Sequence, residues 1–93
     1  MTNELTTFTV KVIGRVQGVG YRSWVKKRAI CFELQGWVIN SEDKSVSMKI
    51  SGKKKNIKIF LIECYKGPIF SKVLNVKAKE ITFKPFKGFQ IRY

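Results

Sequence analysis

The chain has 93 residues, of which 44% are hydrophobic and 27% are charged. This length allows one domain with one core and is too short for two. The first twelve residues contain no basic start followed by an apolar run, which argues against a signal peptide. No stretch approaches the roughly 18 to 20 apolar residues that span a bilayer. We therefore expect a cytoplasmic globular protein with no membrane partner. We also expect a monomer, although no feature of the sequence fixes the oligomeric state.

The net charge is +13, from 19 lysines and arginines against six acidic residues. Such a charge attracts polyanions and anionic substrates. It does not choose between nucleic acid, an anionic membrane surface and a small phosphate compound. Lysine supplies most of the excess and is spread along the chain, so a compositional bias explains much of the charge.

The two cysteines, Cys31 and Cys64, both fall in segments predicted to be helical. We expect free thiols that pack as small hydrophobic side chains, because a disulfide framework in a small secreted domain usually has more cysteines. The chain contains no histidine. The ligands of zinc, haem and di-iron sites are thus missing, and we expect no metal and no cofactor.

Residues 1–6 are predicted to form a flexible tail. Apolar residues at Phe8, Val10 and Val12 alternate with polar ones, which predicts a half-buried strand. The segment 14–20 has three glycines in seven residues and is predicted to be a loop. From Arg22 to about Glu33, apolar residues recur at helical spacing, and the expected stop is Gly36.

Two short strands are predicted at 37–40 and 45–50, joined by a hairpin over 41–44. Residues 54–66 have the spacing of an amphipathic helix, with Gly67 and Pro68 as its end. Residues 73–83 are predicted to be mostly extended. Alternation over 89–93 predicts a last strand.

This order predicts an α+β protein with a ferredoxin-like βαββαβ sandwich. Two helices should cover one face of a mostly antiparallel sheet, with an added C-terminal strand, and residues 1–93 should form a single domain. A right-handed first crossover makes the strands on either side of the first helix parallel. Arg22 follows the first of these strands and Asn40 ends the second, so topology can bring the two residues together. The run Lys53-Lys54-Lys55 should lie at the opposite end, outside any site there.

The loop before the first helix suits an anion. Glycines let successive amides point into one concavity, and the helix that follows adds its positive dipole end. Arg22 in the first turn adds a planar fork of donors. The loop matches neither GxGxxG nor GxxxxGK[ST]. Taken alone, such a loop is more often a structural turn.

The segment Gly14-Arg-Val-Gln-Gly-Val-Gly-Tyr-Arg22 resembles the signature of the acylphosphatase family, and the resemblance extends over nearly the whole chain. The second family segment has its counterpart in Gly36-Trp-Val-Ile-Asn40 and the residues after it. Two positions depart from the family pattern. Lys44 replaces a glycine in the hairpin turn, and Ile39 replaces a polar residue. A lysine held there at positive φ would cost on the order of 1 kcal/mol.

The resemblance implies a hydrolase that converts acyl phosphates into carboxylate and inorganic phosphate without a metal. It implies that Arg22 holds the phosphate and that Asn40 positions the attacking water. Backbone amides of the loop are implied as further phosphate ligands: Gln17, Gly18, Val19, Gly20, Tyr21 and Arg22. Gln17 and Val19 are expected to act mainly through the backbone, and Tyr21 and Trp24 through packing.

Two alternatives remain open. A basic ferredoxin-like sheet with aromatic residues is also typical of nucleic-acid binders, and 87–89 begins like an RNA-recognition signature before diverging. We disfavour nucleic acid as the main partner, because the family motifs point to a small acyl phosphate. The second alternative is a catalytically silent member that acts as a binding module.

Overall fold

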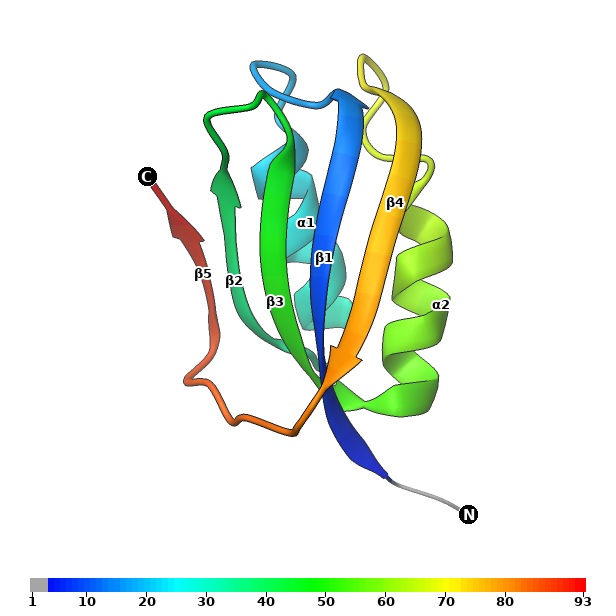
Figure 1. Ribbon diagram of the computed structural model, residues 1–93, viewed down its shortest axis with the longest axis vertical. Helices are drawn as coiled ribbons and strands as arrows, with labels where there is room; N and C mark the ends of the chain where they lie inside the picture. The colour runs from blue at the N-terminus through cyan, green and yellow to red at the C-terminus, as the bar shows by residue number, and fades with distance from the viewer. Residues whose placement is uncertain (1–3) are drawn as a thin grey trace.

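The computed structural model describes residues 4–93 and has two layers (Figure 1). Five strands form one sheet, and both helices lie on the same face of it. The elements in chain order are β1 (Leu5–Arg15), α1 (Tyr21–Cys31), β2 (Gln35–Asn40), β3 (Val46–Lys53), α2 (Lys54–Cys64), β4 (Lys72–Ile81) and β5 (Phe89–Arg92). The predicted α+β ferredoxin-like fold with an added C-terminal strand is confirmed.

The strand order in the sheet is β4-β1-β3-β2-β5. β1 and β2 each pair antiparallel with β3, so they run parallel to each other, as the crossover argument predicts. β5 pairs parallel with β2 at the edge of the sheet. The carboxyl ends of β1 and β2 therefore share one end of the sheet, at the top of Figure 1. The lysine run at 53–55 lies at the other end, where β3 passes into α2.

The core lies between the sheet and the two helices. Alternate residues of the central strands face the helices, which explains the period of two in the sequence. α1 contributes Val25 and Ala29, and α2 contributes Ile57 and Phe60, all fully buried. The strands contribute Val10, Val12, Val38, Val46, Met48 and Ile50.

The end of α1 differs from the prediction. The helix ends at Cys31, two residues before Glu33, because Glu33 adopts a left-handed φ of 58°. Gly36 does not stop the helix, since it is the second residue of β2. A Cβ on Gly36 would lie 1.8 Å from the carbonyl oxygen of Lys49. The glycine is thus needed for the close approach of β2 and β3.

Two further expectations need correction. Residues 1–3 of the predicted tail lie outside the described residues, but Leu5 and Thr6 belong to β1, and Thr6 Oγ1 donates a hydrogen bond of 2.6 Å to Glu80. Both cysteines are free, yet only Cys64 is buried. Cys31, the last residue of α1, is exposed. The single-domain organisation stays a prediction. Among residues 4–93, no helix is long and apolar enough to cross a membrane.

Candidate active site

A small polar cavity of about 130 Å³ lies at the end of the sheet where β1 and β2 finish. Arg22 enters it from the first turn of α1, and Asn40 enters it from the last position of β2. The two residues therefore face one cavity, as the topology argument expects. The remaining lining residues come from the loop, the first turn of α1 and the C-terminal segment: Val16, Gly18, Gly20, Tyr21, Ser23, Ile91 and Tyr93.

The loop between β1 and α1 reaches the helix through left-handed backbone. Gly18 has φ 74° and Gly20 has φ 81°, and a Cβ at either position would meet nothing within 4 Å. These glycines are therefore needed for their backbone angles and not for space. Gly20 is the N-cap residue of α1, and no side chain caps the helix.

The N-terminus of α1 presents free donors to the cavity. The first helical hydrogen bond runs from the Trp24 amide to the Gly20 carbonyl, at 3.1 Å. The amides of Tyr21, Arg22 and Ser23 precede that bond and so lack an intrahelical acceptor. All three residues line the cavity. The positive end of the helix dipole adds about half an elementary charge at the same place.

The side chain of Arg22 is held by the C-terminal segment. Its Nη1 donates a hydrogen bond of 2.6 Å to the carbonyl of Arg92, and its guanidinium carbon lies 4.6 Å from the ring centroid of Tyr93. A guanidinium has five N–H donors, so most of them stay available to a ligand. β5 thus fixes the direction of a side chain that lies 70 residues earlier in the chain.

Asn40 brings a buried acceptor into the cavity. Its Oδ1 is buried and accepts no hydrogen bond from any residue in 4–93. Such an atom costs about 1–3 kcal/mol relative to a satisfied one. The cavity wall therefore contains an oxygen suited to a donor supplied by a ligand or a water molecule.

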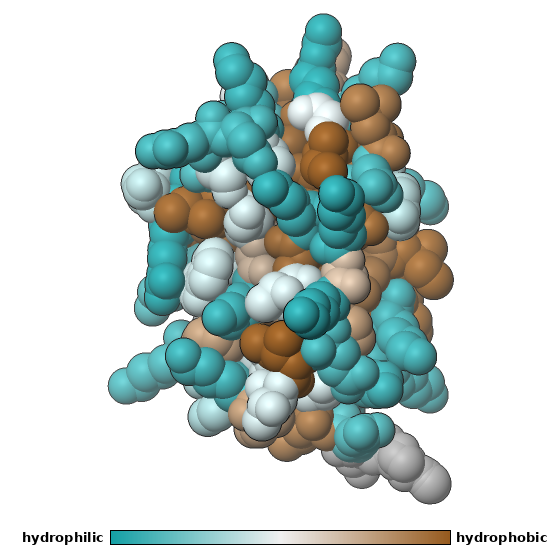
Figure 2. All heavy atoms as spheres, in the orientation of Figure 1, coloured by the Kyte–Doolittle hydropathy of each residue, from teal (hydrophilic) through white to brown (hydrophobic). Residues whose placement is uncertain are grey.

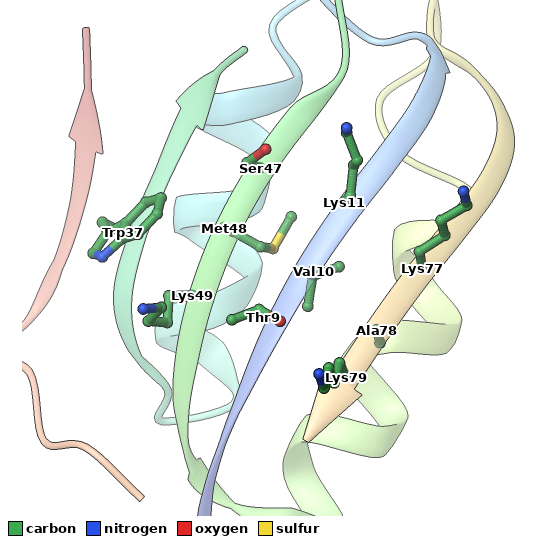
Figure 3. A pocket seen from close by; sticks show the side chains of 10 residues that line it. All are labelled: Thr9, Val10, Lys11, Trp37, Ser47, Met48, Lys49, Lys77, Ala78 and Lys79. Carbon is green, nitrogen blue, oxygen red and sulfur yellow. The ribbon is translucent and has the colours of Figure 1, made fainter. Parts of the chain in front are cut away.

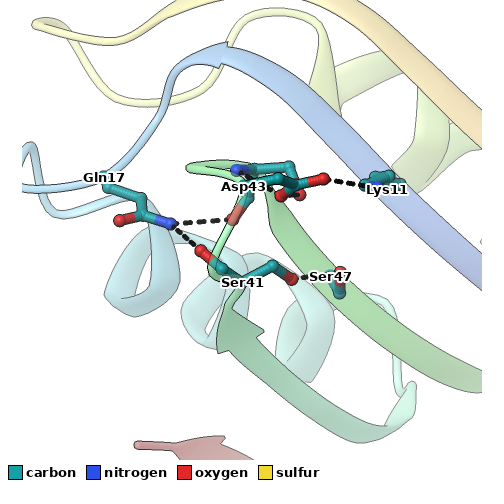
Figure 4. A network of polar contacts seen from close by, with 6 residues as sticks. Lys11, Gln17, Ser41, Asp43 and Ser47 are labelled. Atoms are coloured by element: carbon teal, nitrogen blue, oxygen red, sulfur yellow. Dashed lines mark hydrogen bonds and ion pairs between the residues drawn. The ribbon is translucent and has the colours of Figure 1, made fainter.

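Gln17 ties the loop to the turn that follows Asn40 (Figure 4). Its Nε2 donates to the carbonyls of Ser41 and Ser45, at 2.8 and 2.9 Å. Inside the turn, the Ser45 amide and hydroxyl both donate to Asp43, which also pairs with Lys11 at 2.6 Å. The contact with Lys11, followed by those with Ser45, lowers the pKa of Asp43 below its usual range.

Lys44 adopts a φ of 75° in this turn, so the departure from the family pattern is accommodated with left-handed backbone. Its amide still donates to the Ser41 carbonyl, at 3.1 Å. The lysine holds a positive φ, which glycine adopts most readily. The conformation is one that L-residues adopt at a cost.

Tyr21 packs beneath the loop and anchors α1 to α2. It is 1% exposed, and its hydroxyl donates a hydrogen bond of 2.7 Å to the Cys64 carbonyl. Burial raises the pKa of Tyr21 well above its usual range. Burial likewise raises the pKa of Cys64 to about 12. The predicted packing role of Tyr21 agrees with this position, and Trp24 packs beside it, with ring centroids 5.5 Å apart.

The structure brings together only part of the expected ligand set. Gly18, Gly20, Tyr21, Arg22 and Asn40 line the cavity, whereas Gln17 and Val19 do not. Sequence reasoning missed Ser23, Ile91 and Tyr93, and it missed the side-chain contacts of Gln17. Ser23 could have been inferred from its place in the first turn of the helix. Nothing local signals the other contacts. Those of Ile91 and Tyr93 depend on β5 lying beside β2, and those of Gln17 depend on the β2–β3 turn lying beside the loop.

Larger depressions lie away from this cavity. Two of about 390 Å³ involve the sheet face opposite the helices and the adjoining turn, and neither includes Arg22 or Asn40. Volume alone would therefore select places other than the cavity in which Arg22, Asn40 and the free helix amides meet. Among residues 4–93, no cluster of three side chains suits a metal ion.

The fold and the cavity define a small ferredoxin-like α+β protein with an arginine and an asparagine at the free N-terminus of a helix. The acylphosphatase family model matches residues 8–91. An acylphosphatase of Clostridium acetobutylicum is 41% identical over 87 residues, which cover 92% of this chain and 96% of that protein.

Solved structures agree with the sequence match. An acylphosphatase from Coxiella burnetii superposes with a TM-score of 0.92 at 34% identity, covering 97% of this chain and 94% of the other. The acylphosphatase from Bacillus subtilis superposes with a TM-score of 0.92 at 33% identity, covering 97% of this chain and 100% of the other. The chain belongs to the acylphosphatase family and is an enzyme of that family.

Proposed function

We propose that this protein hydrolyses acyl phosphates to a carboxylate and inorganic phosphate, using Arg22 and Asn40 and no metal. The observation that carries the proposal is the meeting of these two side chains in one cavity at the free N-terminus of α1. Family membership supports the reaction class. The roles of the individual residues rest on the chemistry of the cavity.

Arg22 and the amides around it hold the phosphoryl group. Phosphoryl transfer depends mainly on positioning and charge stabilisation. The Arg22 guanidinium and the amides of Tyr21, Arg22 and Ser23 converge on the cavity, and the helix dipole favours negative charge there. Gly18 and Gly20 give the loop the left-handed backbone that leads into the N-terminus of α1. Gln17 and Val19 do not line the cavity, so we assign them no direct contact.

Asn40 positions the attacking water. Its unpartnered Oδ1 accepts a hydrogen bond from water without placing a negative charge beside the phosphate. The water oxygen attacks phosphorus, the bond from phosphorus to the acyl oxygen breaks, and the carboxylate leaves. Its conjugate acid has a pKa of about 4 to 5, so the leaving group needs no general acid. The proton of the water passes to a phosphate oxygen or to solvent.

Replacing Arg22 tests the phosphate assignment. Arg22→Ala should lower kcat/KM for benzoyl phosphate by about 10²-fold or more, because preorganised donors to the transition state are typically worth that much. Arg15→Ala is the matched control: this arginine is exposed, lies outside the cavity and should leave activity unchanged. The assay is run with and without EDTA. Equal activity of Arg22→Ala and wild type would refute the site, and loss of activity in EDTA would refute metal independence.

Replacing Asn40 tests the water assignment. Asn40→Ala should lower kcat, while inorganic phosphate still inhibits with an unchanged inhibition constant, because Arg22 and the amides remain. Thermal unfolding of the variant is measured in parallel. Weaker inhibition by phosphate, at unchanged kcat, would instead assign Asn40 to phosphate binding. A cytoplasmic location and a monomeric state remain predictions from the sequence.

A further inference from the structure

The sheet face that the helices leave uncovered presents two rows of side chains across all five strands. Cross-strand pairing places Lys79, Thr9, Lys49, Trp37 and Gln90 in one row. The next row contains Lys77, Lys11, Ser47, Ile39 and Arg92. These positions alternate with the core positions, so their side chains point away from the helices. We call this surface the open face; Figure 3 shows most of it.

The open face is strongly basic. Five of its ten row positions are lysine or arginine, and none is acidic. Lys11 and Lys77 lie directly opposite each other, an arrangement of like charges that destabilises a sheet. Lys11 is paired with Asp43, but the three ion pairs found within residues 4–93 leave out Lys49, Lys77 and Lys79. An anion on this face would relieve the repulsion.

An aromatic platform stands beside the lysines. Trp37 is half-buried, and the guanidinium carbon of Arg92 lies 4.9 Å from its ring centroid. Between Trp37 on β2 and the lysines on β4 runs a shallow depression of about 390 Å³. Figure 2 shows hydrophilic side chains surrounding apolar ones across this view of the molecule. Charged and stacking groups therefore occur together on one sheet surface.

We propose that the open face binds single-stranded nucleic acid, as a second function separate from hydrolysis. Phosphates lie on Lys49, Lys77 and Lys79, and a base stacks at Trp37. Single strands are bound in this way, by a basic surface that follows the backbone and aromatic rings that stack bases. A duplex would require an element that enters a groove, and a flat sheet face has none. Inorganic polyphosphate would use the lysines but not the ring.

The two functions occupy opposite faces of the sheet. Asn40 pairs with Val46 on the helix side, whereas Trp37 and Lys49 lie on the other side. A strand on the open face thus leaves the cavity accessible. The proposal does not depend on the hydrolytic mechanism, and binding can be measured without substrate.

Fluorescence anisotropy with labelled oligo(dT) and oligo(U) of about 15 nucleotides tests the proposal. Affinity is measured from about 50 to about 200 mM salt, because counterion release makes the slope report phosphate contacts. Lys49→Ala/Lys79→Ala should weaken binding and reduce the slope by about 1.4, since each single-strand contact contributes about 0.7. The control variant Lys27→Ala/Lys55→Ala removes two exposed charges from the helix layer. It should change both the affinity and the salt slope far less.

The ring is tested separately from the charge. Trp37→Leu should weaken oligonucleotide binding at least about fivefold, and Trp37→Phe should retain most of it, because every aromatic ring offers a stacking surface. Circular dichroism and thermal unfolding establish that each variant is folded. Equal losses in the two lysine pairs, or no binding at about 50 mM salt, would overturn the proposal.

Two competing explanations have their own outcomes. If inorganic polyphosphate of similar length binds as tightly and Trp37→Leu has no effect, the face is only a polyanion surface and the proposal is wrong. If Arg22→Ala abolishes oligonucleotide binding, or inorganic phosphate displaces the strand, binding occurs at the cavity and the proposal is equally wrong. Unchanged binding in Arg22→Ala supports it, whatever that variant does to hydrolysis.

Discussion

At the scale of the residue, Lys44 is one of two non-glycine residues within 4–93 that hold a left-handed backbone, and Glu33 is the other. The Lys44 φ of 75° lies where Cβ crowds the backbone, and this lysine sits four residues after Asn40. The turn keeps its shape because Asp43 binds Ser45 and because the Lys44 amide reaches Ser41. The strain is therefore held by neighbouring hydrogen bonds and need not reach the cavity.

Lys44→Gly should raise the free energy of unfolding by about 1 kcal/mol, since glycine adopts this backbone angle without crowding. For a domain of this size, the melting temperature should rise by about 4–8 °C. Thermal unfolding measures the effect, and Lys44→Ala, which keeps the Cβ, is the control that should show no such gain. An equal rise in both variants would mean that the lysine charge, and not the backbone, is responsible.

At the scale of the element, the loop before α1 and the β2–β3 turn form one unit joined by Gln17. Its two hydrogen bonds reach carbonyls on both sides of the turn, 24 and 28 residues away in sequence. The loop leads into the helix N-terminus that presents the donors of the cavity, and the turn follows the strand that carries Asn40. Gln17 thus sets the distance between the two halves of the candidate site without lining it.

Gln17→Met, which keeps the length of the side chain but removes its donors, should lower stability by about 1–2 kcal/mol, because each neutral hydrogen bond contributes about 1 kcal/mol. We also expect kcat to fall more than inhibition by phosphate weakens, since the turn moves relative to the loop. Denaturant unfolding and steady-state kinetics provide the two readings. Unchanged kcat at reduced stability would limit Gln17 to a structural role.

At the scale of the whole molecule, the sheet separates two chemical environments. One face packs against the helices, and its buried contact between Tyr21 and Cys64 holds α1 to α2 below the cavity. The other face, the open face, carries lysines at paired positions of neighbouring strands, such as Lys11 opposite Lys77. Burial raises the pKa of the Tyr21 hydroxyl and of the Cys64 thiol, so both stay protonated far into the alkaline range. The cause is desolvation, because a charge in the interior would lose its hydration.

Stability should therefore fall in alkali. The unfolded Cys64 thiol ionises near pH 8.5, whereas burial raises its pKa to about 12 in the folded state. Between these values the unfolded chain has lost a proton that the folded chain keeps, so raising the pH favours unfolding. The thiol contributes a slope of about 1.4 kcal/mol per pH unit. Denaturant titrations from pH 7 upward measure it, and Cys64→Ala should lose that part of the slope whatever its stability at pH 7.

The sequence by itself determined the elements, their order and the two residues, Arg22 and Asn40, that line one cavity. Periodicity acts over a few residues and the glycine loop is contiguous, so β1, α1 and α2 could be placed to within a few residues. The parallel relation of β1 and β2 followed from the handedness of crossovers, and it was enough to bring Arg22 and Asn40 to one end of the sheet.

Tertiary structure alone decided the rest, because those contacts depend on register and strand order. The place of β5 beside β2 puts the Arg92 carbonyl and Tyr93 against Arg22. Gly36 was expected to stop a helix, but it lies in β2, where the close approach of β3 leaves no room for a Cβ. Lysines that are scattered in the sequence become two rows only when five strands align, since cross-strand neighbours can be many residues apart. Part of the +13 net charge, to which composition assigned no role, thus lies on the open face.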